Sequence, residues 1–68
     1  MLDPNTNLVE ATAASNAGDW QRAFDLANPL LAYAPEHAGL HYVVGLSALG
    51  LKQMPVAIRH LQRALKLE

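Results

Sequence analysis

The chain has no cysteine, which excludes disulfide bonds, thiolate metal sites and thiol catalysis. Aromatic residues make up only 6% of its 68 residues although 51% are hydrophobic, because alanine and leucine supply much of the apolar content. Both residue types favour helices. The composition therefore predicts a small all-α domain. With no sign of an oxidising compartment, a cytoplasmic location is expected.

Long hydrophobic runs are also missing. The longest nearly apolar run, residues 42–51, is about half as long as a membrane span requires, and no signal-type segment opens the chain. The formal net charge of −1 gives no general attraction to nucleic acid or to anionic lipid. We therefore expect neither a membrane nor a nucleic acid as a partner.

Recognisable catalytic constellations are lacking as well. Ser15 and Ser47 lie in no nucleophile motif, no pair of carboxylates is evident, and no glycine-rich phosphate loop follows a strand. We expect no enzymatic activity and no cofactor.

Two histidines four positions apart raise the question of a metal site. On one continuous helix, His37 and His41 would share a face and could bind zinc or nickel with Glu36 as a third ligand. Pro35 instead favours a helix that starts near residues 37–38, which places His37 in a loop or cap and His41 on the helix surface. We interpret the stretch as a join between two helices and expect no metal site.

Arg59, Arg63 and Lys66 form a basic stripe on the last predicted helix. A solvated face is favoured over a nucleic-acid site, because aromatic side chains for base stacking are not interleaved with the stripe. His60, which stands between two of these arginines, is expected to be an exposed helix residue.

Turn signals divide the chain into four helix-sized pieces, with breaks near Gly18, Pro35 and residues 50–55. Pro29 lies inside the second piece. A proline within a helix removes a backbone hydrogen bond and costs about 3 kcal/mol, so a kink or break is expected near Asn28.

The chain aligns with itself when each position is compared with the one 34 places later. Identical residues then meet at four positions: Val9 with Val43, Ala14 with Ala48, Ala23 with Ala57, and Leu31 with Leu65. Apolar character is kept where Leu8 meets Tyr42 and Phe24 meets Ile58. A period of about 34 residues with two helices in each period is typical of a known repeat architecture.

With this period, the chain resembles the tetratricopeptide repeat (TPR) family, whose unit is an antiparallel helix pair. Its small and large positions are matched by Gly45, Ala48, Ala57, Leu61 and Ala64, its turn by Gly18 and Asp19, and its aromatic position by Trp20. The resemblance implies one domain over residues 1–68, with units at about 5–35 and 36–68. It also implies four helices in two antiparallel pairs, which form a right-handed superhelix.

Three details depart from the family pattern or extend it. Lys52 stands where the family usually has glycine, so Gly50 is expected to make the tight bend of the second turn. Pro4 and Pro35 are three positions closer together than one repeat period, which predicts a first helix about one turn short. Trp20 is expected to be largely buried against the second helix of its own unit.

The resemblance implies a protein–protein interaction scaffold that binds a peptide or a partner helix on the concave face formed by the first helix of each unit. The residues implied for this face are Leu8, Thr12, Ser15, Asn16, Tyr42, Leu46 and Leu49. Tyr42 is the strongest candidate for an anchor. The family's carboxylate clamp is disfavoured, because Leu8, Thr12 and Val43 replace its polar residues, so an apolar or amphipathic segment is the expected ligand.

Self-association is expected through the last helix. Ile58 and Leu65 point where a third unit would pack, and a homodimer would cover them. Both ends of the chain resemble junctions between repeats. The alternative function is therefore that of the TPR portion of a larger enzyme, of glycosyltransferase or sulfotransferase type, or of a secretion or assembly factor.

Overall fold

The computed structural model describes residues 4–68, which fold into four α-helices and one short 3₁₀ helix. The elements are α1 (Pro4–Asn16), α2 (Trp20–Ala27), the 3₁₀ helix η1 (Asn28–Ala32), α3 (Ala38–Gly50) and α4 (Met54–Leu67). No strand occurs in this part of the chain. The prediction of an all-α domain with about four helices is confirmed.

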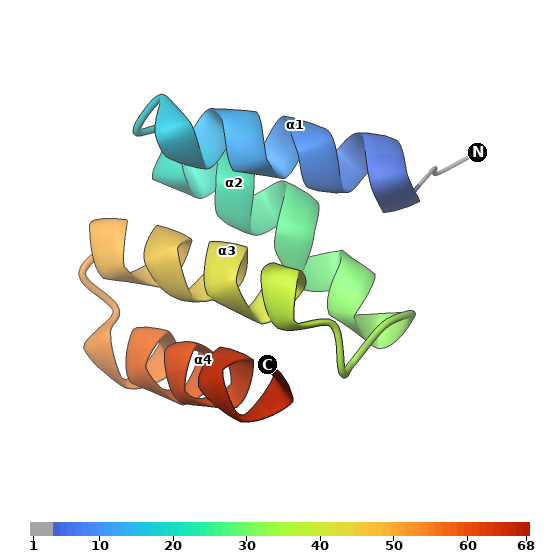
Figure 1. Ribbon diagram of the computed structural model, residues 1–68. Coiled ribbons are helices and arrows are strands. Elements are labelled where there is room, and N and C mark those ends of the chain that lie inside the picture. The colour runs from blue at the N-terminus through green and yellow to red at the C-terminus, as the bar shows by residue number, and fades with distance from the viewer. Residues whose placement is uncertain (1–3) are drawn as a thin grey trace.

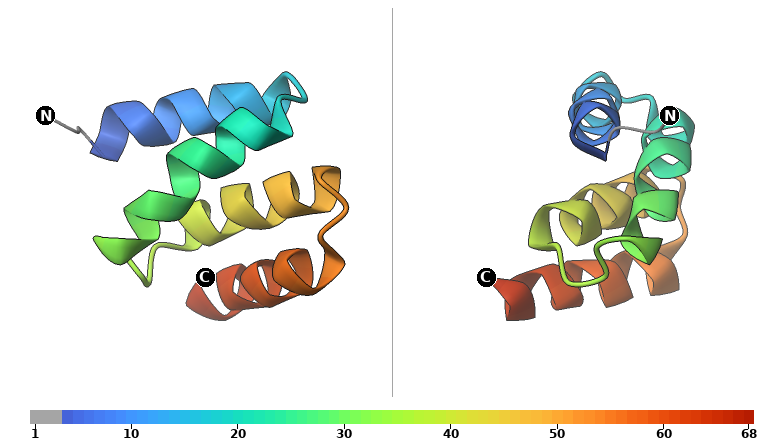
Figure 2. Two further views of the ribbon diagram at one scale, coloured as in Figure 1. Left: turned by 180° about the vertical axis from the view of Figure 1, so that it is seen from behind. Right: turned by 90° about the vertical axis from the view of Figure 1, so that its right-hand side faces the viewer.

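The helices are stacked in chain order from α1 at one end of the molecule to α4 at the other (Figure 1). Each helix packs on the next one, and α3 also contacts α1. Figure 1 and the left view of Figure 2 show α1 antiparallel to α2 and α3 antiparallel to α4. The chain therefore forms two helix pairs that pack against each other through α2 and α3.

The two helix pairs follow the same backbone course, one repeat period apart. Helix α3 begins and ends 34 positions after α1, and α4 begins 34 positions after α2. The turns agree in the same way: Gly18 N–H donates to Ser15 and Asp19 N–H to Ala14, while Lys52 N–H donates to Leu49 and Gln53 N–H to Ala48. These pairs of bonds are the two bonds of a Schellman motif, in which the residue after the C-cap is left-handed.

The left-handed positions are Gly18, with φ of 80°, and Lys52, with φ of 63°. The expectation that Gly50 makes the second bend is wrong, because Gly50 is the last residue of α3 and the bend falls on Lys52. A residue with a Cβ atom pays a conformational cost of about 1–2 kcal/mol in this region, whereas glycine does not.

Substitutions at these two equivalent positions should therefore change stability in opposite directions. Gly18→Ala should lower the free energy of unfolding by about 1 kcal/mol, and Lys52→Gly should raise it by up to about 1 kcal/mol. Apart from Gly18 and its two chain neighbours, no heavy atom of residues 4–68 lies within 4 Å of a Cβ placed on Gly18, so the cost comes from the backbone conformation. Urea unfolding followed by circular dichroism measures both changes. Lys52→Ala is the control: if it stabilises as much as Lys52→Gly, the backbone explanation is wrong.

The break predicted near Asn28 is confirmed. Helix α2 ends at Ala27 and continues as η1, with Pro29 in the first turn of the 3₁₀ helix. Proline is tolerated there because the N–H groups of a first turn have no partner within the helix. The chain thus bends slightly between α2 and η1, and both helices lie on the same side of the molecule (Figure 2).

The prediction of a shortened first helix is wrong, since α1 and α3 each contain 13 residues. Pro4 is itself the first residue of α1, whereas Pro35 precedes α3 by three positions. The two prolines are therefore not equivalent positions, and their spacing does not measure helix length.

The core lies between the two helix pairs. Its buried residues are Ala11, Ala27, Leu30, Leu40, Val43 and Val44. Leu8, Phe24 and Leu31 of the first pair are partly buried and pack against this cluster. Small residues also allow α3 and α4 to approach closely: Ala48, Ala57 and Ala64 are buried, and Gly45 faces Leu61.

Trp20 is partly buried. Its ring lies against Gly50 at the end of α3, where a Cβ atom would overlap with the ring carbons. The tryptophan thus contacts the second helix pair, which was not predicted from the sequence.

Candidate functional site

The predicted peptide-binding residues differ in how much surface they offer. On α1, Thr12 and Asn16 are exposed, Leu8 is half-buried against the core, and Ser15 is buried with 6% exposure. The Thr12 hydroxyl donates to the Leu8 carbonyl at 2.9 Å, so it is already paired within its own helix. Helix α1 therefore contributes little apolar surface.

The second helix pair offers much more apolar surface. Tyr42 is 53% exposed and Leu49 43% exposed, and Leu46 is half-buried. On α4, Ile58 is 53% and Leu65 is 73% exposed. Tyr42 also lines a hollow of about 310 Å³ together with Leu61, Ala64, Leu65 and Glu68. Tyr42, Ile58, Leu61 and Leu65 are called the terminal face below.

The terminal face has a counterpart within the chain. The residues 34 positions before Tyr42, Ile58 and Leu65 are Leu8, Phe24 and Leu31. All three pack against the core cluster, which includes Leu40, Val43 and Val44 of α3. In the first helix pair these three residues pack against the core between the two pairs. The equivalent residues of the second pair are exposed to solvent.

The opposite end of the molecule is more polar. Leu40 and Val44, which are 3% and 0% exposed, face the first helix pair, and the residues 34 positions before them are Thr6 and Glu10. Glu10 is exposed and lies 4.0 Å from Arg22. Val9, at 68% exposure, is the large apolar residue on this side.

A pair of histidines joins α3, α4 and the linker before α3. Nδ1 of His41 lies 2.9 Å from Nδ1 of His60, and Nε2 of His41 lies 2.7 Å from the carbonyl oxygen of Pro35. The rings are stacked with their centroids 5.2 Å apart. Because a carbonyl oxygen can only accept, we infer that His41 Nε2–H donates to Pro35 and that His60 Nδ1–H donates to neutral His41.

The position of these histidines corrects two expectations. His41 is only 8% exposed and is not a surface residue, and His60 is half-buried and not an exposed one. The sequence does contain one indication that His41 is buried. Residues 38–49 are apolar on most sides, so a histidine among them is expected to face a neighbouring helix. His37 caps α3, as predicted for a loop or cap residue: its Nδ1 accepts from Leu40 N–H at 3.2 Å.

The surroundings lower the pKa of His60. Partial burial has the largest effect, followed by the positive charges that His41 and Arg59 carry or acquire. Among residues 4–68, no group of three or more His, Cys, Asp or Glu side chains is placed to hold a metal ion.

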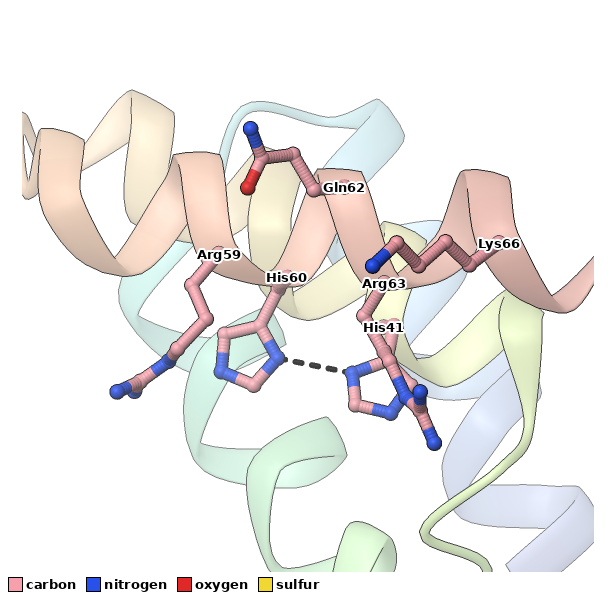
Figure 3. Close-up of a pocket in the computed structure, with 6 residues that line it drawn as sticks. All are labelled: His41, Arg59, His60, Gln62, Arg63 and Lys66. Atoms are coloured by element: carbon pink, nitrogen blue, oxygen red, sulfur yellow. Dashed lines mark hydrogen bonds between the residues drawn. The ribbon is translucent and has the colours of Figure 1, made fainter.

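The histidine pair borders a basic hollow of about 310 Å³ (Figure 3). Its lining residues are His41, Arg59, His60, Gln62, Arg63 and Lys66. Arg63 also lies 3.7 Å from Glu36, which is in the linker before α3. The arginines and the lysine of the predicted basic stripe thus surround one concave site.

Comparison with models of protein families gives no match, and neither the curated proteins nor the solved structures contain a match to this chain. No helix of the described part of the chain is both long and apolar enough to cross a membrane.

Proposed function

We propose that the chain is a protein-binding scaffold of the TPR type, whose two helix pairs belong to a right-handed superhelix. The observation that carries the proposal is the exposure of Tyr42, Ile58 and Leu65, whose counterparts in the first pair are packed against the core between the two pairs. A surface that holds a helix pair within the chain is suited to hold helices of another molecule. The equal spacing of the helices and of the turn hydrogen bonds in the two pairs supports the family resemblance.

The proposed ligand is an apolar or amphipathic segment. Tyr42 is the anchor, because a half-exposed aromatic side chain supplies a large contact area and loses little conformational entropy. Leu46 and Leu49 extend the apolar surface along α3. Thr12 and Asn16 of α1 would form its polar border.

A second copy of the chain is the partner that we propose for Ile58 and Leu65, the most exposed α4 residues of the terminal face. Head-to-tail stacking would place Tyr42, Ile58 and Leu65 against the outer side of α1, where Glu10 replaces the fully buried Val44. Burial of Glu10 together with its neighbour Arg22 removes both charges from water, which costs several kcal/mol per ion. A two-fold dimer instead pairs Ile58 and Leu65 of one copy with the same residues of the other copy and closes.

Substitutions in the terminal face should dissociate the dimer. Burial of one Ile or Leu side chain contributes about 1.5–3 kcal/mol, so Ile58→Ser and Leu65→Ser should each weaken association at least tenfold. Sedimentation equilibrium at tens of micromolar measures this constant. Val9→Ser is the matched control, because Val9 is 68% exposed on the opposite side and its replacement should leave the dimer intact.

Two results would count against the dimer. One is a monomer at every concentration whose stability does not change with Ile58→Ser or Leu65→Ser. The other is an equal loss of association in Val9→Ser, which would point to contacts outside the terminal face.

A further inference from the structure

The basic hollow between α3 and α4 concentrates positive charge in a chain that is slightly acidic. The whole chain has five Lys and Arg residues and a formal net charge of −1. Three of these five cations, Arg59, Arg63 and Lys66, line the one hollow, and no carboxylate of the described residues lines it. Glu36 approaches Arg63 from the linker, but its side chain is 77% exposed and its pairing distance is 3.7 Å. Such an exposed pair is weak and is easily replaced by another anion.

The most buried residue that lines the hollow is His41. His41 is 8% exposed and is fixed by hydrogen bonds at both ring nitrogens, to His60 and to the Pro35 carbonyl. His60 uses Nδ1 in this pair, which leaves Nε2 as its other donor or acceptor. Figure 3 shows the His60 ring between the Arg59 side chain and the His41 ring, with Arg63 and Lys66 on the His41 side.

We propose that this hollow binds a phosphate monoester group. A phosphate dianion offers several acceptor oxygens, and the guanidinium groups of Arg59 and Arg63 present planar sets of donors that match them. Lys66 adds a third positive charge, and His60 adds a ring nitrogen at the floor. A carboxylate carries half the charge and fewer acceptor sites, so it would satisfy fewer of these donors.

Binding should also be linked to proton uptake by His60. The charged and titratable groups around it are His41 from α3, Arg59, Arg63 and Lys66 from α4, and Glu36 from the linker. Burial contributes most to the lowered pKa of His60, and a bound dianion favours the protonated ring because it offsets the positive charge of Arg59. Protonated His60 then donates from both nitrogens, and an anion of constant charge binds more tightly as the pH falls.

Titration with inorganic phosphate, followed by NMR at constant ionic strength with chloride as the balancing salt, tests the site. We expect saturable shifts of the His41 and His60 ring signals and of the Arg59 and Arg63 side-chain signals. Arg59→Gln and Arg63→Gln should each weaken binding at least fivefold, since each removes one charge and one set of donors. Lys52→Gln is the control, because it removes the same charge from the exposed α3–α4 turn and should change affinity less than twofold.

Three further results decide the proposal. Shifts that do not saturate, or an equal loss of affinity in Lys52→Gln, would reduce the site to general electrostatic attraction. Sulfate, whose charge is constant near neutral pH, should bind more tightly at lower pH. This gain in sulfate affinity should disappear in His60→Gln. A gain that persists without His60 would overturn the proton linkage.

The source of the phosphate group is distinguished by two probes that compete with inorganic phosphate. Tighter binding of N-acetylphosphoserine amide assigns the group to a phosphorylated protein, and tighter binding of glycerol 3-phosphate assigns it to a small metabolite. Failure of both to displace inorganic phosphate would overturn a monoester site. None of the lining residues belongs to the terminal face, so these outcomes do not depend on the dimer.

Discussion

Replacing Gly45 by leucine should destabilise the protein by about 3 kcal/mol, because α3 and α4 meet at this residue. Even a single Cβ atom at position 45 would lie 2.7 Å from Leu61 Cγ and 3.2 Å from the Leu61 backbone nitrogen. The side chain of Leu61 can rotate, but the backbone nitrogen moves only if α4 moves. A leucine therefore forces α4 away from α3 and exposes Ala57 and Ala64, which are now buried.

Urea unfolding of Gly45→Leu measures this loss, and Ala13→Leu provides the control. Ala13 is exposed on α1, so the same side chain there should change the free energy of unfolding by less than about 0.5 kcal/mol. A double-mutant cycle locates the clash: Gly45→Ala combined with Leu61→Ala should cost less than the sum of the single substitutions. Additive costs would mean that Leu61 is not the residue that limits the space.

Replacing His41 by alanine should lower the free energy of unfolding by about 2–3 kcal/mol near neutral pH, because it removes a buried ring and the hydrogen bonds to His60 and to the Pro35 carbonyl. These bonds join two helices and a linker. His37→Asn is the control, because asparagine also caps a helix and should leave stability nearly unchanged.

The difference between wild type and His41→Ala should narrow as the solution is acidified. The pKa of His60 in the folded protein lies below its ordinary value of 6.5, so below that pH the unfolded chain binds more protons and the wild type loses stability. Without His41, the pKa of His60 returns toward its ordinary value and this loss shrinks. Unfolding curves at about pH 7.5 and pH 5.5 measure the change. If the difference in free energy of unfolding between the two proteins is the same at both pH values, His41 does not affect the titration of His60, and this prediction is wrong.

The sequence predicts those parts of the fold that depend on local chemistry. The all-helical class follows from the abundance of alanine and leucine, the break after Ala27 from Pro29, and the capping role of His37 from the proline before it. Each of these features is decided within a short stretch of chain. The length of α1 was predicted wrongly because one proline lies in a helix and the other in a linker.

The candidate sites depend on which residues meet across helices, and this is harder to predict. His41 and His60 are 19 positions apart and meet only because α3 and α4 cross near both of them. Lys52 adopts the left-handed conformation although glycine stands two positions earlier, and Gly50 instead lies where the ring of Trp20 packs. The amino-acid composition does not indicate either contact.

The position of α4 at the end of the stack has a consequence for hydrogen exchange. Among the helices that the structure describes, α3 packs against α1, α2 and α4, whereas α4 packs extensively on α3 alone. Opening of α4 disrupts its one extensive interface, whereas opening of α3 disrupts its interfaces with α1, α2 and α4. Amide protection should therefore be graded along the chain, highest in α3 and lower in α4, so that the last helix exchanges through partial opening while the rest of the protein stays folded.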